Sequence, residues 1–169
     1  GSSLGVDLVP HKVCSMDCIY CQLGRTTSKT LERKEYVPVD EVIGEVREFL
    51  QKGQKCDYIT LSGSGEPSLN SGMGRLIGAI KELTSIPVAI LTNTTLITDP
   101  GVRGEMMGAD LMVPSLDSAR QEVFERVNRP CCGIQVGEII KSLAEFRSNF
   151  RGKIWLEVML VEGRNDRED

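Results

Sequence analysis

The 169-residue chain contains no apolar run long enough to cross a bilayer, and its N-terminus shows no signal-peptide pattern. It also lacks an excess of basic residues, since the net charge is −4 and the isoelectric point is near 5.2. Without a broad basic surface, nucleic-acid binding is disfavoured, although a local basic patch is still compatible with the composition. Six cysteines without a secretory segment favour metal or redox chemistry in a reducing compartment. We therefore expect a cytoplasmic protein with no membrane association.

The length of the chain suits a single domain with a substantial core, so we predict one domain over residues 1–169. The chain has no initiator Met, begins directly with a strand-like segment and stops within the charged stretch 163–169. We therefore expect a core that lacks flanking segments on both sides.

The segment 13–24, V-C-S-M-D-C-I-Y-C-Q-L-G, carries the strongest functional signal. Cys14, Cys18 and Cys21 are separated by three and then two residues, so their thiolates can converge on one metal centre. A structural zinc ion takes four closed ligands, and electron-transfer iron–sulfur clusters are held by four cysteines. Three cysteines on a four-iron cluster would leave one iron open to a ligand that is not protein.

Two non-enzymatic alternatives use the same loop. The one histidine, His11, lies close enough in sequence to Cys14 to complete a Cys3His zinc site. An electron-transfer cluster would need a fourth cysteine, which only Cys56, Cys131 or Cys132 could provide. Apart from that possibility, Cys56 is expected to be a small buried apolar residue, and the other two are expected to be free thiols.

Strand-like and helix-like segments alternate along the chain. The strand-like segments are mostly continuous apolar runs, which is typical of a parallel sheet covered by helices. The predicted fold class is therefore α/β. The expected strands are Ser3–Val9, Asp57–Ser62, Pro87–Thr92, Asp110–Ser115 and Lys153–Val161. The expected helices are 40–53, with Asp40 as its cap, 72–83, 99–107, 121–127 and 136–150.

Polar residues follow the predicted strands at their carboxyl ends, where parallel α/β folds bind ligands. Each residue alone could be an ordinary turn residue or helix cap, but their joint placement on one rim predicts a binding site. In the glycine-rich segment, backbone carbonyls can approach a ligand ammonium while a glutamate supplies negative charge. The residues are Gly63, Ser64, Gly65, Glu66 and Pro67, then Asn93, then Ser115 and Asp117, then Asn165 and Asp166.

The cysteine spacing, with Tyr20 directly before the last cysteine, resembles the signature loop of radical S-adenosylmethionine (radical SAM) enzymes. The segment 63–67 resembles that superfamily's Gly-Gly-Glu-Pro segment, with Ser64 replacing a glycine. The phrases S-L-G-V-D-L-V-P, N-R-P and L-E-V-M-L-V-E-G-R-N-D resemble a branch of iron–sulfur oxidoreductases distantly similar to the tRNA wyosine-synthesis enzymes. The resemblance covers nearly the whole chain. It implies a radical SAM core at residues 1–169, folded as a partial (β/α) barrel of parallel strands with outer helices and truncated at both ends.

This resemblance also implies cofactors and an activity. Cys14, Cys18 and Cys21 would hold three irons of a 4Fe-4S cluster, and S-adenosyl-L-methionine would chelate the fourth. With an electron from a flavodoxin- or ferredoxin-like donor, the enzyme would cleave S-adenosylmethionine to methionine and a 5′-deoxyadenosyl radical that abstracts hydrogen from a substrate. The implied cofactor contacts are Tyr20, beside the adenine, with Gly63, Ser64, Gly65, Glu66, Asn93, Ser115 and Asp117.

The sequence says less about the substrate than about the cofactors. Glu157 lies inside an apolar strand and is expected to face the inside of an open barrel, where it could contact substrate or cofactor. Arg129 and the basic residues of segment 25–34 are further candidates, although segment 25–35 is expected to be a solvated loop. Because an acidic chain offers few phosphate contacts, a small molecule or peptide is expected rather than tRNA.

Overall fold

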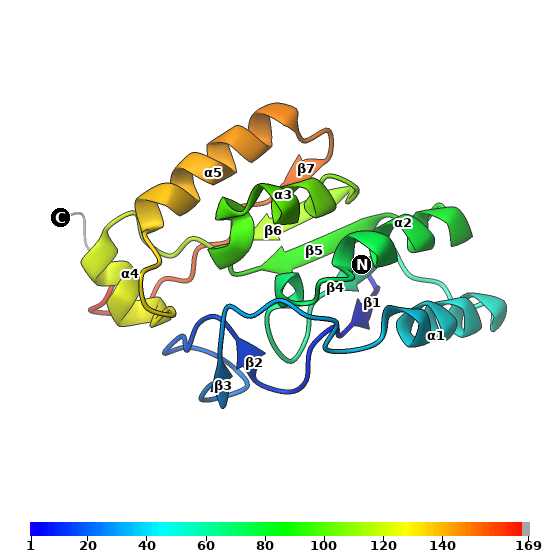
Figure 1. Cartoon of the computed structure of the whole chain (residues 1–169), viewed down its shortest axis with the longest axis horizontal. Helices are drawn as coiled ribbons and strands as arrows, with labels where there is room; N and C mark the ends of the chain where they lie inside the picture. The colour runs from blue at the N-terminus through cyan, green and yellow to red at the C-terminus, as the bar shows by residue number, and fades with distance from the viewer. Residues whose placement is uncertain (167–169) are drawn as a thin grey trace.

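A five-stranded parallel sheet forms the centre of the computed structural model, which describes residues 1–166 (Figure 1). The strand order is β1-β4-β5-β6-β7, and every pairing is parallel. This arrangement confirms the predicted α/β class. The strands are Ser3–Val6 (β1), Tyr58–Leu61 (β4), Val88–Thr92 (β5), Leu111–Pro114 (β6) and Lys153–Ile154 (β7).

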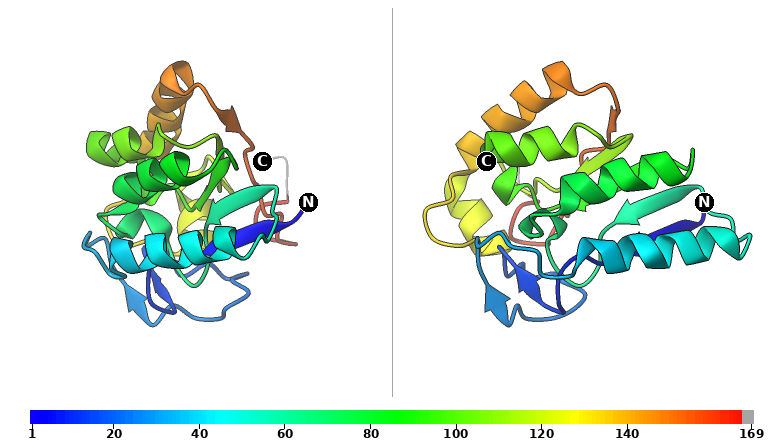
Figure 2. Two further views of the ribbon diagram at one scale, coloured as in Figure 1. Left: turned by 90° about the vertical axis from the view of Figure 1, so that its right-hand side faces the viewer. Right: turned by 45° about the vertical axis from the view of Figure 1, so that its right-hand side comes forward.

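Helices connect the strands and gather on one side of the sheet (Figure 2). The opposite side is open, so the sheet forms a partial barrel that is not closed. The α-helices of the described residues are Val39–Gln51 (α1), Met73–Leu83 (α2), Pro100–Met106 (α3), Gln121–Asn128 (α4) and Val136–Asn149 (α5). Short 3-10 helices at Pro67–Leu69 (η1) and Thr95–Thr98 (η2) follow β4 and β5. Within residues 1–166, none of the helices has the length and apolar character that crossing a bilayer requires.

The hydrophobic core lies between the sheet and these helices. Ile59, Val88, Ile90 and Met112 are buried strand residues that pack in one cluster with apolar side chains of α1, α2, α3 and α5. Leu91, next to Ile90 on β5, is 37% exposed because neighbouring strand residues point to opposite faces. The apolar residues of a continuous run therefore lie alternately on the face of the sheet that the helices cover and on the open face.

The fifth strand is shorter than predicted. It was expected over Lys153–Val161, but only Lys153–Ile154 forms a regular strand. The Trp155 and Glu157 N–H groups still donate to carbonyls of β6, each at 2.9 Å. Pro114 has no N–H to donate in return, which interrupts the ladder between them. The chain then runs on as an exposed apolar edge that includes Leu160.

The start of α1 also differs from the prediction. Asp40 is not its cap, because Pro38 takes the N-cap position and makes no side-chain cap hydrogen bond. The Glu35 carboxylate instead accepts from the Val39 N–H at 2.6 Å. Asp40 lies in the first turn, where a negative charge suits the helix dipole, and pairs with Arg75 at 2.7 Å.

Segment 25–35 is mostly solvent-exposed, as its mixed charges predict, but it is not wholly irregular. Ser28–Lys29 (β3) pairs in parallel with Val13–Cys14 (β2), and the two form a small second sheet. The Arg33 guanidinium donates to the Ser68 carbonyl at 2.9 Å and pairs with Glu105 at 2.6 Å. Arg33 therefore ties the loop to the rest of the fold and is not free to meet a substrate.

Candidate metal and cofactor site

The cysteine loop is held in place by the C-terminal end of α4. The Asp17 N–H donates to the Asn128 carbonyl at 3.0 Å, and the Ile19 N–H donates to the Val127 carbonyl at 2.9 Å. Carbonyls in the last turn of a helix have no partner within the helix, so they are available to an adjoining loop. A helix more than a hundred residues away in sequence thus fixes the conformation of the loop.

Each of the three thiols lies beside a nitrogen donor from a different part of the chain, and all three cysteines are half-buried. Burial raises the pKa of Cys14 to about 12 and also raises the pKa of Cys18. These two thiols are therefore neutral at pH 7 without a metal, and a metal must displace their protons on binding. The donor pairs are Asn93 Nδ2 with Cys14 Sγ at 3.4 Å, Asn128 Nδ2 with Cys18 Sγ at 3.5 Å, and Lys12 Nζ with Cys21 Sγ at 3.3 Å.

Nitrogen donors aimed at three sulfurs fit an anionic iron–sulfur group, because hydrogen bonds to ligand sulfurs stabilise their negative charge. Among the described residues, no three His, Cys, Asp or Glu side chains are placed to share a single metal ion. The assignment of the three cysteines as iron ligands therefore stays a prediction. Cys56 precedes the amino end of β4, whereas the loop lies at the carboxyl edge of the sheet, so Cys56 cannot be a fourth ligand. Cys131 is near, since its N–H donates to the Ser15 carbonyl at 2.9 Å.

The segment after β4 packs directly against the entry to the cysteine loop. The Lys12 N–H donates to the Ser64 carbonyl at 2.7 Å, and the Glu66 N–H donates to the Val13 carbonyl at 3.1 Å. A Cβ on Gly65 would lie 1.9 Å from the Val13 oxygen, which only glycine avoids. The glycine-rich segment thus shapes the loop through backbone contacts.

Gly63 is constrained by Asp7, which follows β1. Its φ of +130° favours glycine, and a Cβ there would lie 2.6 Å from the Asp7 carboxyl carbon. The Asp7 carboxylate accepts from the Ser64 N–H at 2.9 Å. Asp7 was not predicted as a site residue, because it falls inside the predicted strand Ser3–Val9, whereas β1 ends at Val6.

Glu66 points into the protein. It is 2% exposed, and its carboxylate accepts from the Ser68 N–H at 3.1 Å, the Ser68 hydroxyl at 2.5 Å, the Thr92 hydroxyl at 2.7 Å and the Asn93 N–H at 2.7 Å. Burial raises its pKa, and these hydrogen bonds oppose the shift. Glu66 therefore joins the ends of β4 and β5, a structural role that the sequence did not reveal. Its expected contact with a cofactor ammonium stays a prediction.

Asp117 connects the cysteine loop with α4 and the end of the described chain. Its carboxylate accepts from the Tyr20 hydroxyl and from Asn128 Nδ2, each at 2.5 Å, and from the Met159 N–H at 2.8 Å. Asn165 Nδ2 donates to the Asp117 backbone carbonyl at 2.8 Å. Burial, the neighbouring Cys18 and the bond to Asp117 all raise the pKa of Tyr20, which therefore stays protonated.

The predicted site residues separate into two groups. The three cysteines, Tyr20, Glu66, Asn93 and Asp117 are joined by the contacts above, although chain segments far apart in sequence supply them. Ser115 lies apart from this network, with its hydroxyl 3.4 Å from Glu157. Glu157 is exposed on the irregular edge after β7. Asn128 and Lys12 belong to the site but were missed, since Asn128 ends a helix and Lys12 belongs to no recognisable motif.

The comparisons with known proteins agree with this geometry. The sequence profile of the Radical SAM superfamily matches residues 8–169. The "GTPase Obg" of Brachyspira hyodysenteriae is 42% identical over 169 residues, which are 100% of this chain and 25% of that protein. The structure "Native anSMEcpe with bound AdoMet" superposes with a TM-score of 0.68 at 20% identity, covering 91% of this chain and 42% of that one. The structure "Structure of TYW1 with a lysine-pyruvate adduct bound" superposes with a TM-score of 0.62 at 14% identity, covering 96% of this chain and 57% of that one.

The chain belongs to the radical SAM superfamily and is an enzyme of that superfamily. The two structural likenesses establish the fold alone, because both lie below 25% identity. The chain spans 25% to 61% of the length of the curated relatives that it matches at 34% identity or more. Membership confirms the resemblance found in the sequence and disfavours a non-enzymatic zinc or electron-transfer module.

Proposed function

We propose that residues 1–169 form a core domain in which Cys14, Cys18 and Cys21 hold a 4Fe-4S cluster that binds S-adenosylmethionine. The observation that carries the proposal is the nitrogen donor beside each of the three sulfurs in a chain of this superfamily. When bound, these cofactors supply reductive cleavage of S-adenosylmethionine to methionine and a 5′-deoxyadenosyl radical that abstracts hydrogen from a substrate. The thiols need a reducing compartment, so we assign this chemistry to the cytoplasm.

The protein's own contribution is to position the cofactors and to limit access of water. The end of α4 fixes the cysteine loop, and the segment 63–66 presses against its entry. Tyr20 within the loop and Asn93 beside it are proposed cofactor contacts, with Ser64, Gly65 and Asp117 at the same rim. Gly63, Glu66 and Ser115 complete the proposed set, although the carboxylate of Glu66 must keep its internal hydrogen bonds if it serves both roles.

Iron content and the visible spectrum of anaerobically reconstituted protein test the proposal. We expect about four irons per chain, with loss of the cluster when Cys14, Cys18 or Cys21 is replaced by Ala. Cys56→Ala is the matched control, because that thiol lies at the other end of the sheet and should leave the iron content unchanged. Stoichiometric zinc without iron would overturn the proposal.

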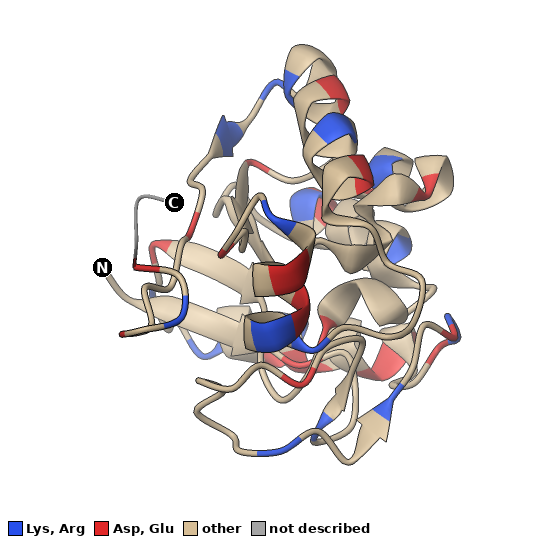
Figure 3. Cartoon of the chain, turned by 90° about the vertical axis from the view of Figure 1, so that its left-hand side faces the viewer, with Lys and Arg blue, Asp and Glu red and all other residues tan. Residues whose placement is uncertain are grey.

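We further propose that the substrate is a small molecule or peptide and that the electron comes from a flavodoxin- or ferredoxin-like donor. Lys and Arg are interspersed with Asp and Glu in the view of Figure 3, and the described residues offer no broad phosphate-binding surface on this side. Arg33, one of the candidate basic residues, is already paired with Glu105. Arg25 and Arg129 are exposed basic residues beside the loop, and both lie close to Asp17.

Binding of tRNA by this chain, measured as a function of salt concentration, tests the substrate class. Affinity for nucleic acid comes largely from phosphate contacts and falls steeply with salt. We expect weak binding in low salt that disappears near physiological salt. Tight binding with a steep salt dependence would overturn the proposed substrate class in favour of RNA.

A further inference from the structure

Lys12 occupies a strained and buried position at the entry to the cysteine loop. Its φ of +64° lies in the left-handed region, which is uncommon for a residue other than glycine. Its N–H donates to the Ser64 carbonyl at 2.7 Å, and its carbonyl accepts from the Ser28 N–H at 3.1 Å. The residue is only 3% exposed although it carries an ammonium. Strain of this kind persists where the surrounding structure fixes it, often at functional sites.

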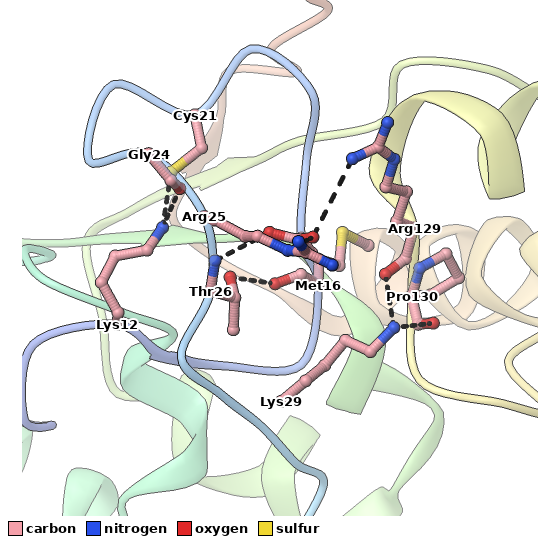
Figure 4. A network of polar contacts seen from close by, with 10 residues as sticks. Lys12, Met16, Cys21, Gly24, Arg25, Thr26, Lys29, Arg129 and Pro130 are labelled. Atoms are coloured by element: carbon pink, nitrogen blue, oxygen red, sulfur yellow. Dashed lines mark hydrogen bonds and ion pairs between the residues drawn. The ribbon is translucent and has the colours of Figure 1, made fainter.

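The ammonium of Lys12 ends beside the third cysteine of the loop (Figure 4). Its Nζ lies 3.3 Å from Cys21 Sγ and also donates to the Gly24 carbonyl. None of the ion pairs within residues 1–166 includes Lys12. A buried ammonium is costly unless an anion lies next to it. Of the two groups to which it donates, only the Cys21 sulfur can become an anion.

We propose that Lys12 is a positioning residue that acts through Cys21 and raises the reduction potential of the iron–sulfur group bound by the loop. The inference rests on the proposed function. Reduction transfers one electron to the site and adds one negative charge. A fixed positive charge at hydrogen-bond distance from a ligand sulfur favours the reduced state. Because Lys12 is buried, solvent and salt screen this effect only weakly.

A purely structural role is the alternative, in which Lys12 only anchors the turn at Gly24. The two roles differ in the effect of charge. A structural anchor affects how much iron the protein holds but does not shift the potential of the iron that is bound. A charge effect lowers that potential when the ammonium is replaced by a neutral group, and an arginine restores it.

The experiment compares anaerobically reconstituted wild-type protein with Lys12→Met, Lys12→Arg and Lys29→Met. The midpoint potential is measured by titration with dithionite, the electron source, and followed by electron paramagnetic resonance without S-adenosylmethionine or substrate. We expect Lys12→Met to lower the ratio of reduced to oxidised protein about tenfold at a fixed potential, a shift of about 59 mV for one electron. Lys12→Arg should stay near the wild-type value.

Lys29→Met is the matched control, because it removes the same charge from the adjacent strand β3. Lys29 Nζ donates to the carbonyls of Arg129 and Pro130, each at 3.3 Å, and neither partner is a thiol. The midpoint potential of Lys29→Met should equal that of the wild type. An equal shift in this control would show a general effect of net charge and overturn the inference.

Equal potentials for wild-type protein and Lys12→Met would also overturn the inference while leaving the proposed function intact. If Lys12→Met fails to fold or to hold iron, Lys12→Gln takes its place, since its neutral amide can still donate, and the same comparison decides. Wild-type protein that binds no iron would overturn the proposed function, and this inference with it.

Discussion

Replacing Glu66 by Ala should destabilise the metal-free protein strongly. The buried carboxylate accepts from two backbone N–H groups, those of Ser68 and Asn93, and from two hydroxyls. The hydroxyls can rotate towards other acceptors, but the backbone groups cannot. An unsatisfied buried donor costs about 1–3 kcal/mol, so two of them predict a loss of about 2–6 kcal/mol in the free energy of unfolding.

Urea unfolding followed by far-ultraviolet circular dichroism measures this loss. An unchanged slope of the unfolding free energy against urea concentration would show that wild type and variant expose the same surface on unfolding. Glu66→Gln should lose less, because its carbonyl can serve most of the donors while its NH2 group faces one of them. Glu48→Ala is the control, since Glu48 makes only an exposed pair with Lys52 at 2.7 Å and should leave the midpoint unchanged. A loss below about 1 kcal/mol for Glu66→Ala would refute the argument.

Three further predictions follow from the geometry. Gly65→Ala places a Cβ 1.9 Å from the Val13 carbonyl oxygen and should lower the free energy of unfolding in urea by at least about 2 kcal/mol. Gly78→Ala is the control, because it faces open space in α2 and should not lower that free energy. Because the pKa of Cys14 is about 12, its thiolate fraction at pH 8 is ~10⁻⁴, and iodoacetamide should label it roughly 10³-fold more slowly than a peptide thiol; equal rates by mass spectrometry would contradict this. Partial burial raises the pKa of Asp110, but a lysine ammonium and a backbone N–H lower it further, to below its ordinary 3.8. The ionised carboxylate therefore stabilises the folded protein above pH 3.8, and this stabilisation is lost as the pH falls through the lowered pKa. Asp110→Asn should therefore flatten the loss of stability below about pH 5, and an unchanged pH profile of urea midpoints would count against it.

The sequence alone determined the features that depend on neighbouring residues. The spacing of Cys14, Cys18 and Cys21 is local, and it led to the correct superfamily. Apolar runs and helical periodicity placed the strands and the helices that cover them, with errors at their ends that are largest in the first and fifth strands. Because parallel strands put their carboxyl ends on one edge, the sequence also predicted that Asn93 and Asp117 would lie near the cysteine loop, as the structure confirms.

Only the tertiary structure decided which polar groups face one another. Asn93 and Asn128 come from positions far from the loop in sequence, and Lys12, although near it, belongs to no recognisable motif. No local pattern therefore marked Lys12 or Asn128 as a donor to a cysteine sulfur. Glu66 looked like a ligand for a cofactor because the sequence cannot show that four internal donors already surround it. The fifth strand ended early because Pro114 on its neighbour lacks an N–H, and pairing between strands becomes visible only when both are in place.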